Sequence, residues 1–186
     1  AQFEGMGRDW CEAFPIAKQT FAEASEHLGF SLEKACWESG DDINRTDLAQ
    51  PGILVTSIAA IRVLEQEAGL DRSKASMTAG LSLGEYTALW CAGSLDFGDA
   101  VKLVRLRGQA MQDAAEQIPS GMLSLMGGDE AMAKQLAAIA SEHGICAVAN
   151  LNAPGQVILS GEHKALEAAA AAAKDVGVRR TRPLVV

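Results

Sequence analysis

Aromatic residues and cysteines are scarce in this chain of 186 residues, which has three Trp, one Tyr, five Phe and four Cys. The cysteines, Cys11, Cys36, Cys91 and Cys146, show no CxxC spacing, so neither a metal site nor a disulfide framework is expected. We find no signal peptide and no apolar run of membrane length. These absences predict a cytoplasmic protein with reduced thiols.

Basic residues are outnumbered, because 16 Lys and Arg face 24 Asp and Glu and give a net charge of −8. This balance disfavours nucleic acid and anionic membranes as partners. Hydrophobic residues, by contrast, make up 48% of the chain. That content and this length can bury a core, as one domain or as a domain with a small appendage.

The segment 80–84, GLSLG, has the spacing of a nucleophile elbow. Small apolar residues precede it at 75–79 and a helical pattern follows at 85–92, so we predict a strand, a sharp turn and a helix. Its two glycines would let strand and helix approach where a Cβ would clash. Ser82 would then be presented as a nucleophile, and the N–H of Leu83 would receive an oxyanion. The alternative is an ordinary Gly/Ser turn.

The helical pattern over 99–116 carries a charge in an unexpected place. When successive residues are placed about 100° apart, the polar side chains gather on one side, but Arg107 falls within the apolar arc. A guanidinium keeps its charge and is costly to bury without an acceptor, so Arg107 is a candidate ligand for an anionic group. An internal carboxylate partner, or a side chain that reaches a nearby edge, would be the structural explanation.

Two further helices are predicted before the elbow. One runs from Pro15 to about His27, and a longer one opens at Pro51 and continues with apolar residues at helical spacing as far as Leu64. The polar stretch 38–46 reads as a loop.

The last third of the chain alternates between strand and helix patterns. Their order is strand, helix, strand, strand, helix, strand, with a hairpin turn at Pro154-Gly155. This order predicts a ferredoxin-like (βαββαβ) subdomain over residues 119–186.

Residues 79–112, AGLSLGEYTALWCAGSLDFGDAVKLVRLRGQAMQ, closely resemble the nucleophile region of malonyl-CoA:acyl-carrier-protein transacylases of fatty-acid biosynthesis and of the related polyketide-synthase acyltransferase domains. GMGRDW, TDLAQPGILVTSIAAIRVL and NLNAPGQVILSG resemble other stretches of that family in the same order, so the resemblance covers essentially the whole chain. Leu81 departs from it, because many members have histidine there. That neighbour of the nucleophile is not the family's base, so the change bears on packing.

The resemblance implies an α/β enzyme of two parts. Residues 1–118 would form part of an α/β-hydrolase-like acyltransferase core with the elbow, and residues 119–186 an inserted ferredoxin-like small subdomain. The enzyme would transfer a malonyl group from malonyl-CoA to the phosphopantetheine thiol of acyl carrier protein through a seryl ester. It would be a cytoplasmic monomer without a metal or other cofactor.

The resemblance also implies roles for single residues. Ser82 matches the nucleophile, Leu83 supplies an oxyanion N–H, and Arg107 matches the arginine that pairs with the malonyl carboxylate. Gln50 and Met111 are further candidates for the substrate-binding set. Gln50 could equally be a helix-flanking amide.

No general base is obvious among the three histidines. His27, His143 and His163 each lie near a helix end and are expected to be solvated. The family's base histidine would follow Val186, and its oxyanion glutamine would precede Ala1. We therefore expect this chain to be a fragment that lacks both terminal segments of a family member and has at most trace activity by itself.

Four other interpretations fit parts of the pattern, two of them enzymes and two without catalysis. A polyketide-type acyltransferase module or a serine hydrolase would use the same elbow, whereas an inert fragment or a carrier-binding scaffold would use none of it. Arg107 favours an acyl donor with a carboxylate over a simple ester. The absence of a base histidine favours inertness.

Overall fold

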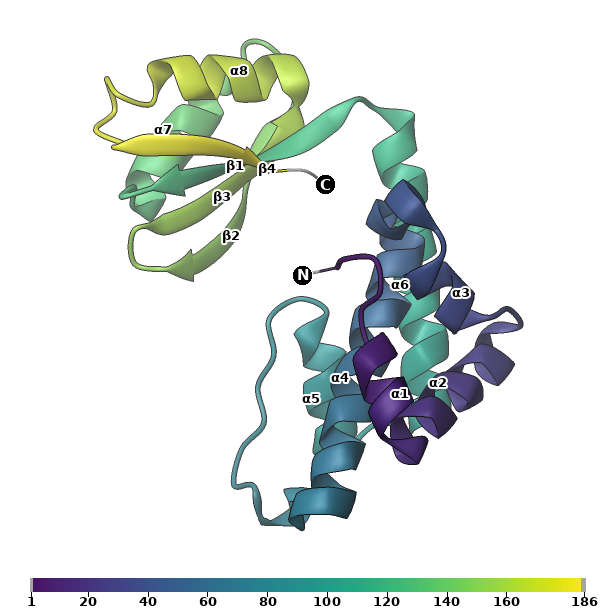
Figure 1. Cartoon of the computed structure of the whole chain (residues 1–186). Coiled ribbons are helices and arrows are strands. Elements are labelled where there is room, and N and C mark those ends of the chain that lie inside the picture. Colours follow the sequence, from purple (N-terminus) through teal and green to yellow (C-terminus); the bar gives the residue numbers. More distant parts are fainter. Residues whose placement is uncertain (1, 185–186) are drawn as a thin grey trace. The chain divides into compact units, whose positions relative to one another are not determined.

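Helices build the first part of the chain, and a four-stranded sheet with two helices builds the last (Figure 1). This computed structural model describes residues 2–184, and the chain divides into two units between Asp113 and Ala114. The sequence predicts this boundary at 118/119. Each unit is described by itself.

The N-terminal unit contains six α-helices and two 3₁₀ helices among its described residues. These elements are α1 (Arg8–Ala13), α2 (Pro15–Leu28), α3 (Leu32–Trp37), η1 (Gly40–Asn44), α4 (Thr46–Ala68), η2 (Arg72–Lys74), α5 (Gly84–Cys91) and α6 (Phe97–Gln117). Helix α2 begins with Pro15 at its first turn and ends at Gly29, whose φ of 75° is the left-handed conformation of a helix cap. The predicted loop at 38–46 contains η1 and the start of α4.

Helix α4 begins at Thr46 and contains Pro51, so the prediction that it starts at the proline is wrong. Pro51 has no N–H, and the carbonyl four residues earlier, on Asp47, therefore has no donor from the helix. Arg105 of α6 supplies one, because its Nη1 donates to the Asp47 carbonyl as well as to Asp47 Oδ2, at 2.9 Å. A contact from another helix thus replaces the bond that the proline removes.

Helix α4 is also long and apolar enough to cross a membrane by length and composition, contrary to the expectation from the sequence. More than half of its apolar window is buried inside the structure. Leu54, Val55 and Ile58 are fully buried, whereas the predicted core residue Leu64 is 44% exposed. Its packing is that of the central core helix of this unit.

Helix α6 packs a narrower face than its apolar arc predicts. Its buried residues are Phe97, Ala100, Val101, Val104 and Gly108. Leu103 and Leu106 are 45% and 63% exposed and line an open surface hollow. A Cβ on Gly108 would lie 2.8 Å from both the Cα of Asp47 and the carbonyl oxygen of Thr46, so only glycine lets α6 approach the first turn of α4 this closely.

No strand forms at residues 75–79, where the sequence predicts one. The segment is an extended loop before α5 (Figure 1), and Met77 is 83% exposed. A strand needs a neighbour to pair with, and every described strand of this chain lies after residue 119.

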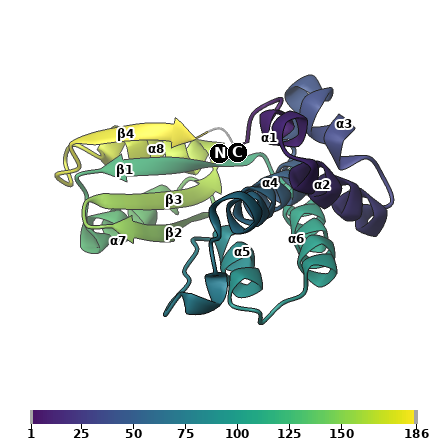
Figure 2. The same ribbon diagram turned by 60° about the horizontal axis from the view of Figure 1, so that its bottom comes forward.

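The C-terminal unit has the predicted order of strands and helices. The elements are β1 (Ser120–Met126), α7 (Glu130–Ala140), β2 (Cys146–Ala153), β3 (Gln156–Glu162), α8 (His163–Ala172) and β4 (Arg180–Leu184). The sheet order is β2-β3-β1-β4 with every neighbouring pair antiparallel, and Figure 2 shows the strands in this order with both helices on one face.

The core of this unit lies between the sheet and its two helices. Leu123, Leu125 and Leu159 point from the strands toward Leu136 and Ala169 of the helices, and all five are buried. The hairpin between β2 and β3 turns at Pro154-Gly155, where Gly155 has a φ of 78°.

The four cysteines are free thiols. Burial raises the pKa of Cys36 to about 12 and is the main cause that raises the pKa of Cys11 to about 11. Both thiols therefore stay protonated at neutral pH and are poor nucleophiles.

The close approach at Gly108 gives a test of the α4–α6 contact. Gly108→Ala places a methyl group against the backbone of α4, which cannot rotate away, so we expect a loss of about 1–3 kcal/mol in the free energy of unfolding. Gln109→Ala is the matched control, because Gln109 is exposed on the same helix. Urea denaturation measures both, and equal stability of the two variants would contradict the contact.

Candidate active site

Ser82 occupies a strained position at the start of α5. Its φ is 49°, and it is the only non-glycine residue with a positive φ in the part of the chain that the structure describes. Such a conformation costs a non-glycine residue about 1–3 kcal/mol and often marks a functional turn. The turn itself is regular, because Gly84 N–H donates to the Leu81 carbonyl at 2.9 Å and Glu85 N–H to that of Ser82 at 3.2 Å.

The two glycines of the elbow have different reasons to be glycine. A Cβ on Gly80 would lie 2.0 Å from the carbonyl carbon and oxygen of Gly84, so this position has no room for a side chain. A Cβ on Gly84 would meet nothing within 4 Å. The expected clash is therefore found at Gly80 alone, and the backbone of Gly84 is the group that causes it.

The N–H of Leu83 follows the serine and immediately precedes the first residue of α5. Within residues 2–184 this N–H donates to no protein acceptor. Free amides at a helix N-terminus, with the positive end of the helix dipole, attract negative charge. The structure thus leaves a donor one residue from the Ser82 hydroxyl.

Arg107 of α6 contacts Ser82 in the 80–84 turn. Its Nη2 donates to Ser82 Oγ at 2.8 Å, its Nη1 donates to Gln50 Oε1, and its guanidinium lies 5.9 Å from the centre of the Tyr86 ring. Among the described residues no Asp or Glu pairs with it, so the internal carboxylate considered as a structural explanation is not found. The positive charge is held by neutral groups beside a hydroxyl.

Gln50 contacts both Arg107 and Met111. Gln50 is only 5% exposed. Its Nε2 donates to Thr46 Oγ1 at 2.7 Å and to Met111 Sδ at 3.2 Å, while its Oε1 accepts from Arg107. Gln50 lies within α4 and does not flank the helix, and it contacts Arg107, while its part in binding a substrate stays a prediction.

Sequence reasoning missed Thr46, Asp47 and Tyr86. Thr46 and Gln50 are four residues apart, and so share a helix face, but this signal is invisible when the helix is started at Pro51. Asp47 is a buried carboxylate whose Oδ2 pairs with Arg105. Tyr86 has no sequence signal beyond its place one turn after the elbow.

The three histidines are all exposed, and none hydrogen-bonds to Ser82 in the described part of the chain. The base histidine and the oxyanion glutamine of the resemblance concern positions outside residues 2–184. Within that range, no group of three or more His, Cys, Asp or Glu side chains is arranged to hold a metal ion.

Comparison with known proteins agrees with the mixed α/β architecture. A family model described as acyl transferase domain matches residues 1–185, and the chain belongs to this family.

Among its relatives is the malonyl CoA-acyl carrier protein transacylase of Escherichia coli K12, which is 40% identical over 187 residues covering all of this chain and 60% of the relative. A solved acyl carrier protein S-malonyltransferase from Vibrio cholerae is similar with 43% identity and a TM-score of 0.85, over all of this chain and 60% of that one. A chain in the solved structure of a type II PKS acyl-carrier protein in complex with its malonyl-transacylase is 39% identical to this chain, with a TM-score of 0.89, over all of this chain and 59% of that one. The chain thus spans about 60% of the length of these relatives.

The close contact at Gly80 predicts the effect of a single methyl group. Gly80→Ala must open the turn, because the groups it meets are backbone atoms, so we expect a lower melting temperature and displacement of Ser82 from Arg107. Gly84→Ala adds the same methyl group in open space in the same turn. Thermal denaturation compares the two, and a Gly80→Ala protein as stable as Gly84→Ala would show that the turn is not constrained in this way.

Proposed function

We propose that this chain belongs to a transferase that moves a malonyl group from malonyl-CoA to the phosphopantetheine thiol of acyl carrier protein. The observation that carries the proposal is Arg107, a half-buried cation whose Nη2 lies 2.8 Å from a strained serine hydroxyl and which has no carboxylate partner among residues 2–184. In malonate the free carboxylate is one methylene away from the acyl carbon. A cation beside the nucleophile suits this substrate.

In the first half of the reaction, Ser82 Oγ bonds to the thioester carbonyl carbon and gives its proton to a base. The carbonyl oxygen becomes an oxyanion, for which the N–H of Leu83 is the proposed donor. The C–S bond then breaks, coenzyme A leaves as a thiol after taking up the proton, and a malonyl ester stays on Ser82. The base is not among the groups that contact Ser82 in residues 2–184.

In the second half, the phosphopantetheine thiol attacks the ester carbonyl and loses its proton to the base. The C–O bond breaks, and Ser82 recovers the proton as its hydroxyl is released. The same oxyanion donor serves both halves, because each passes through a tetrahedral intermediate at the same carbon.

Arg107 is the proposed carboxylate ligand in both halves. In the ligand-free site its Nη2 donates to Ser82 Oγ, and a bound carboxylate would compete for that N–H and leave the hydroxyl free to react. Gln50 would keep its place on Nη1. A serine hydrolase acting on simple esters would have no use for this cation, which favours transfer of a carboxylate-bearing acyl group. Met111 would assist indirectly, as a neighbour of Gln50.

The two units have proposed parts in this enzyme. We assign residues 1–118 to an α/β-hydrolase-like acyltransferase core and residues 119–186 to a ferredoxin-like small subdomain. The antiparallel order β2-β3-β1-β4, with both helices on one face, supports the second assignment. We also propose that the enzyme is cytoplasmic and monomeric and uses no metal or redox cofactor.

The seryl ester gives the first test of this proposal. In the full natural polypeptide, brief incubation with malonyl-CoA is expected to add one malonyl group to Ser82, and Ser82→Ala is expected to abolish the adduct because the attacking oxygen is gone. Intact-protein mass spectrometry measures this. Ser94→Ala, a change at another exposed serine, is the control, and an adduct that persists on Ser82→Ala would remove Ser82 from the mechanism.

The carboxylate ligand gives the second test. Arg107→Ala is expected to lower kcat/KM for malonyl-CoA by roughly thirty- to a thousand-fold, which corresponds to about 2–4 kcal/mol for a charge-assisted pair. Transfer from acetyl-CoA, which offers no carboxylate, is expected to be unchanged or higher. Steady-state kinetics with both donors measure the difference.

Lys102→Ala is the matched control, since it removes an exposed cation from the same helix. Equal loss with both donors in Arg107→Ala would mean that the arginine supports the structure and does not select the substrate.

A further inference from the structure

The buried amide of Gln50 has one orientation that satisfies all of its neighbours. A thioether sulfur only accepts hydrogen bonds, so the Nε2 end must face Met111 Sδ, which lies 3.2 Å away. A guanidinium only donates, so the Oε1 end must face Arg107. Thr46 Oγ1, 2.7 Å from Nε2, is the stronger of the two acceptors that hold the nitrogen end.

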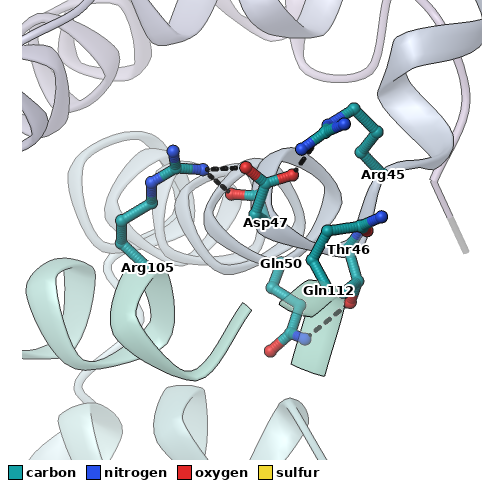
Figure 3. Close-up of polar contacts among 6 residues, drawn as sticks. All are labelled: Arg45, Thr46, Asp47, Gln50, Arg105 and Gln112. Carbon is teal, nitrogen blue, oxygen red and sulfur yellow. Dashed lines mark hydrogen bonds and ion pairs between the residues drawn. The ribbon is translucent and has the colours of Figure 1, made fainter. Parts of the chain in front are cut away.

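Thr46 is itself held by α6. Its backbone N–H donates to Gln112 Oε1 at 3.0 Å, which satisfies one of the free amides at the start of α4. The next residue, Asp47, lies between Arg105 Nη1 at 2.9 Å and Arg45 Nε at 3.2 Å (Figure 3). Gly108 lets the two helices touch at this place.

Helix α6 therefore carries Arg107, and it also holds in place the first turn of α4, which contains Thr46 and leads to Gln50, the residue that contacts Arg107. Figure 3 shows Thr46 and Gln50 on one side of the α4 turn, and Asp47 on the other side between the two arginines. Removal of the Thr46 hydroxyl would leave the Gln50 nitrogen with only a weak sulfur acceptor. The amide could then turn or tilt, and Arg107 would lose a fixed acceptor.

We propose that Thr46 is a positioning residue, whose hydroxyl sets the orientation of the Gln50 amide and through it the guanidinium of Arg107. Only one consequence of this inference rests on the proposed function, namely that the selection of a carboxylate-bearing acyl donor depends on the Thr46 hydroxyl. The orientation itself is a property of the ligand-free protein.

The test compares Thr46→Val, which keeps the shape and removes the acceptor, with Thr46→Ser, which keeps the hydroxyl, in the full natural polypeptide. For Thr46→Val we expect kcat/KM for malonyl-CoA to fall about 5- to 30-fold, mainly through KM, as for loss of one buried hydrogen bond, while transfer from acetyl-CoA changes less than about twofold. Thr46→Ser is expected to restore the selectivity.

Thr56→Val is the matched control, because it makes the same substitution on the same helix at a buried hydroxyl that has no hydrogen-bond partner in the described structure. It is expected to leave the ratio of the two donors unchanged. Equal loss of both donors in Thr46→Val, or failure of Thr46→Ser to restore selectivity, would overturn the inference.

A second readout separates this inference from the proposed function. In the ligand-free protein, Thr46→Val is expected to shift or broaden the NMR signals of the Gln50 side-chain NH₂ and of Arg107 Nε–H, and Thr46→Ser is not. Signals unchanged by Thr46→Val would overturn the inference whatever the activity. If Thr46→Val shifts these signals but the wild-type protein does not discriminate between the two acyl donors, the positioning role is supported and the proposed function is contradicted.

Discussion

The contact between the first turn of α4 and the middle of α6 is the constraint on which the site depends. It exists because Pro51 leaves the Asp47 carbonyl without a helical donor, because Arg105 donates to that carbonyl and to the Asp47 carboxylate, and because Gly108 has no side chain to keep the helices apart. Asp47 has a side chain only 11% exposed, so its charge needs such partners. The result is a fixed distance between two helices that carry the residues around Ser82.

The site combines this fixed helix pair with a strained turn. Ser82 adopts a φ that few residues other than glycine adopt, and Gly80 allows the backbone of Gly84 to pass close beside it. Arg107 then bridges the two parts, since it donates to Ser82 from one nitrogen and to Gln50 from the other. Strain in the turn and order in the helices together hold a hydroxyl and a cation in contact, although 25 residues separate them in the chain.

The sequence was most informative where the chemistry is local. Ser82 follows from the spacing of its glycines, and Arg107 follows from a charge within an apolar arc. Thr46 and Asp47 carry no such local signal, because a proline at residue 51 predicts a helix start there and the donor that replaces its missing bond comes from another helix. The prediction of a strand at 75–79 is wrong for a related reason, because a strand must pair with a neighbouring strand that the local sequence does not reveal. Exposed Leu106 shows that apolar periodicity overstates a buried face.

The central claim is that a cation held beside Ser82 recognises a carboxylate on the acyl group. The most direct measurement changes the substrate and leaves the protein intact, by comparing malonyl-CoA with the analogue whose free carboxylate is a methyl ester. The ester keeps the reacting thioester and nearly the same shape but carries no charge, so the account predicts that kcat/KM falls by roughly thirty- to a thousand-fold, as for loss of a charge-assisted pair. Equal kcat/KM for the two donors in the wild-type enzyme would contradict the account.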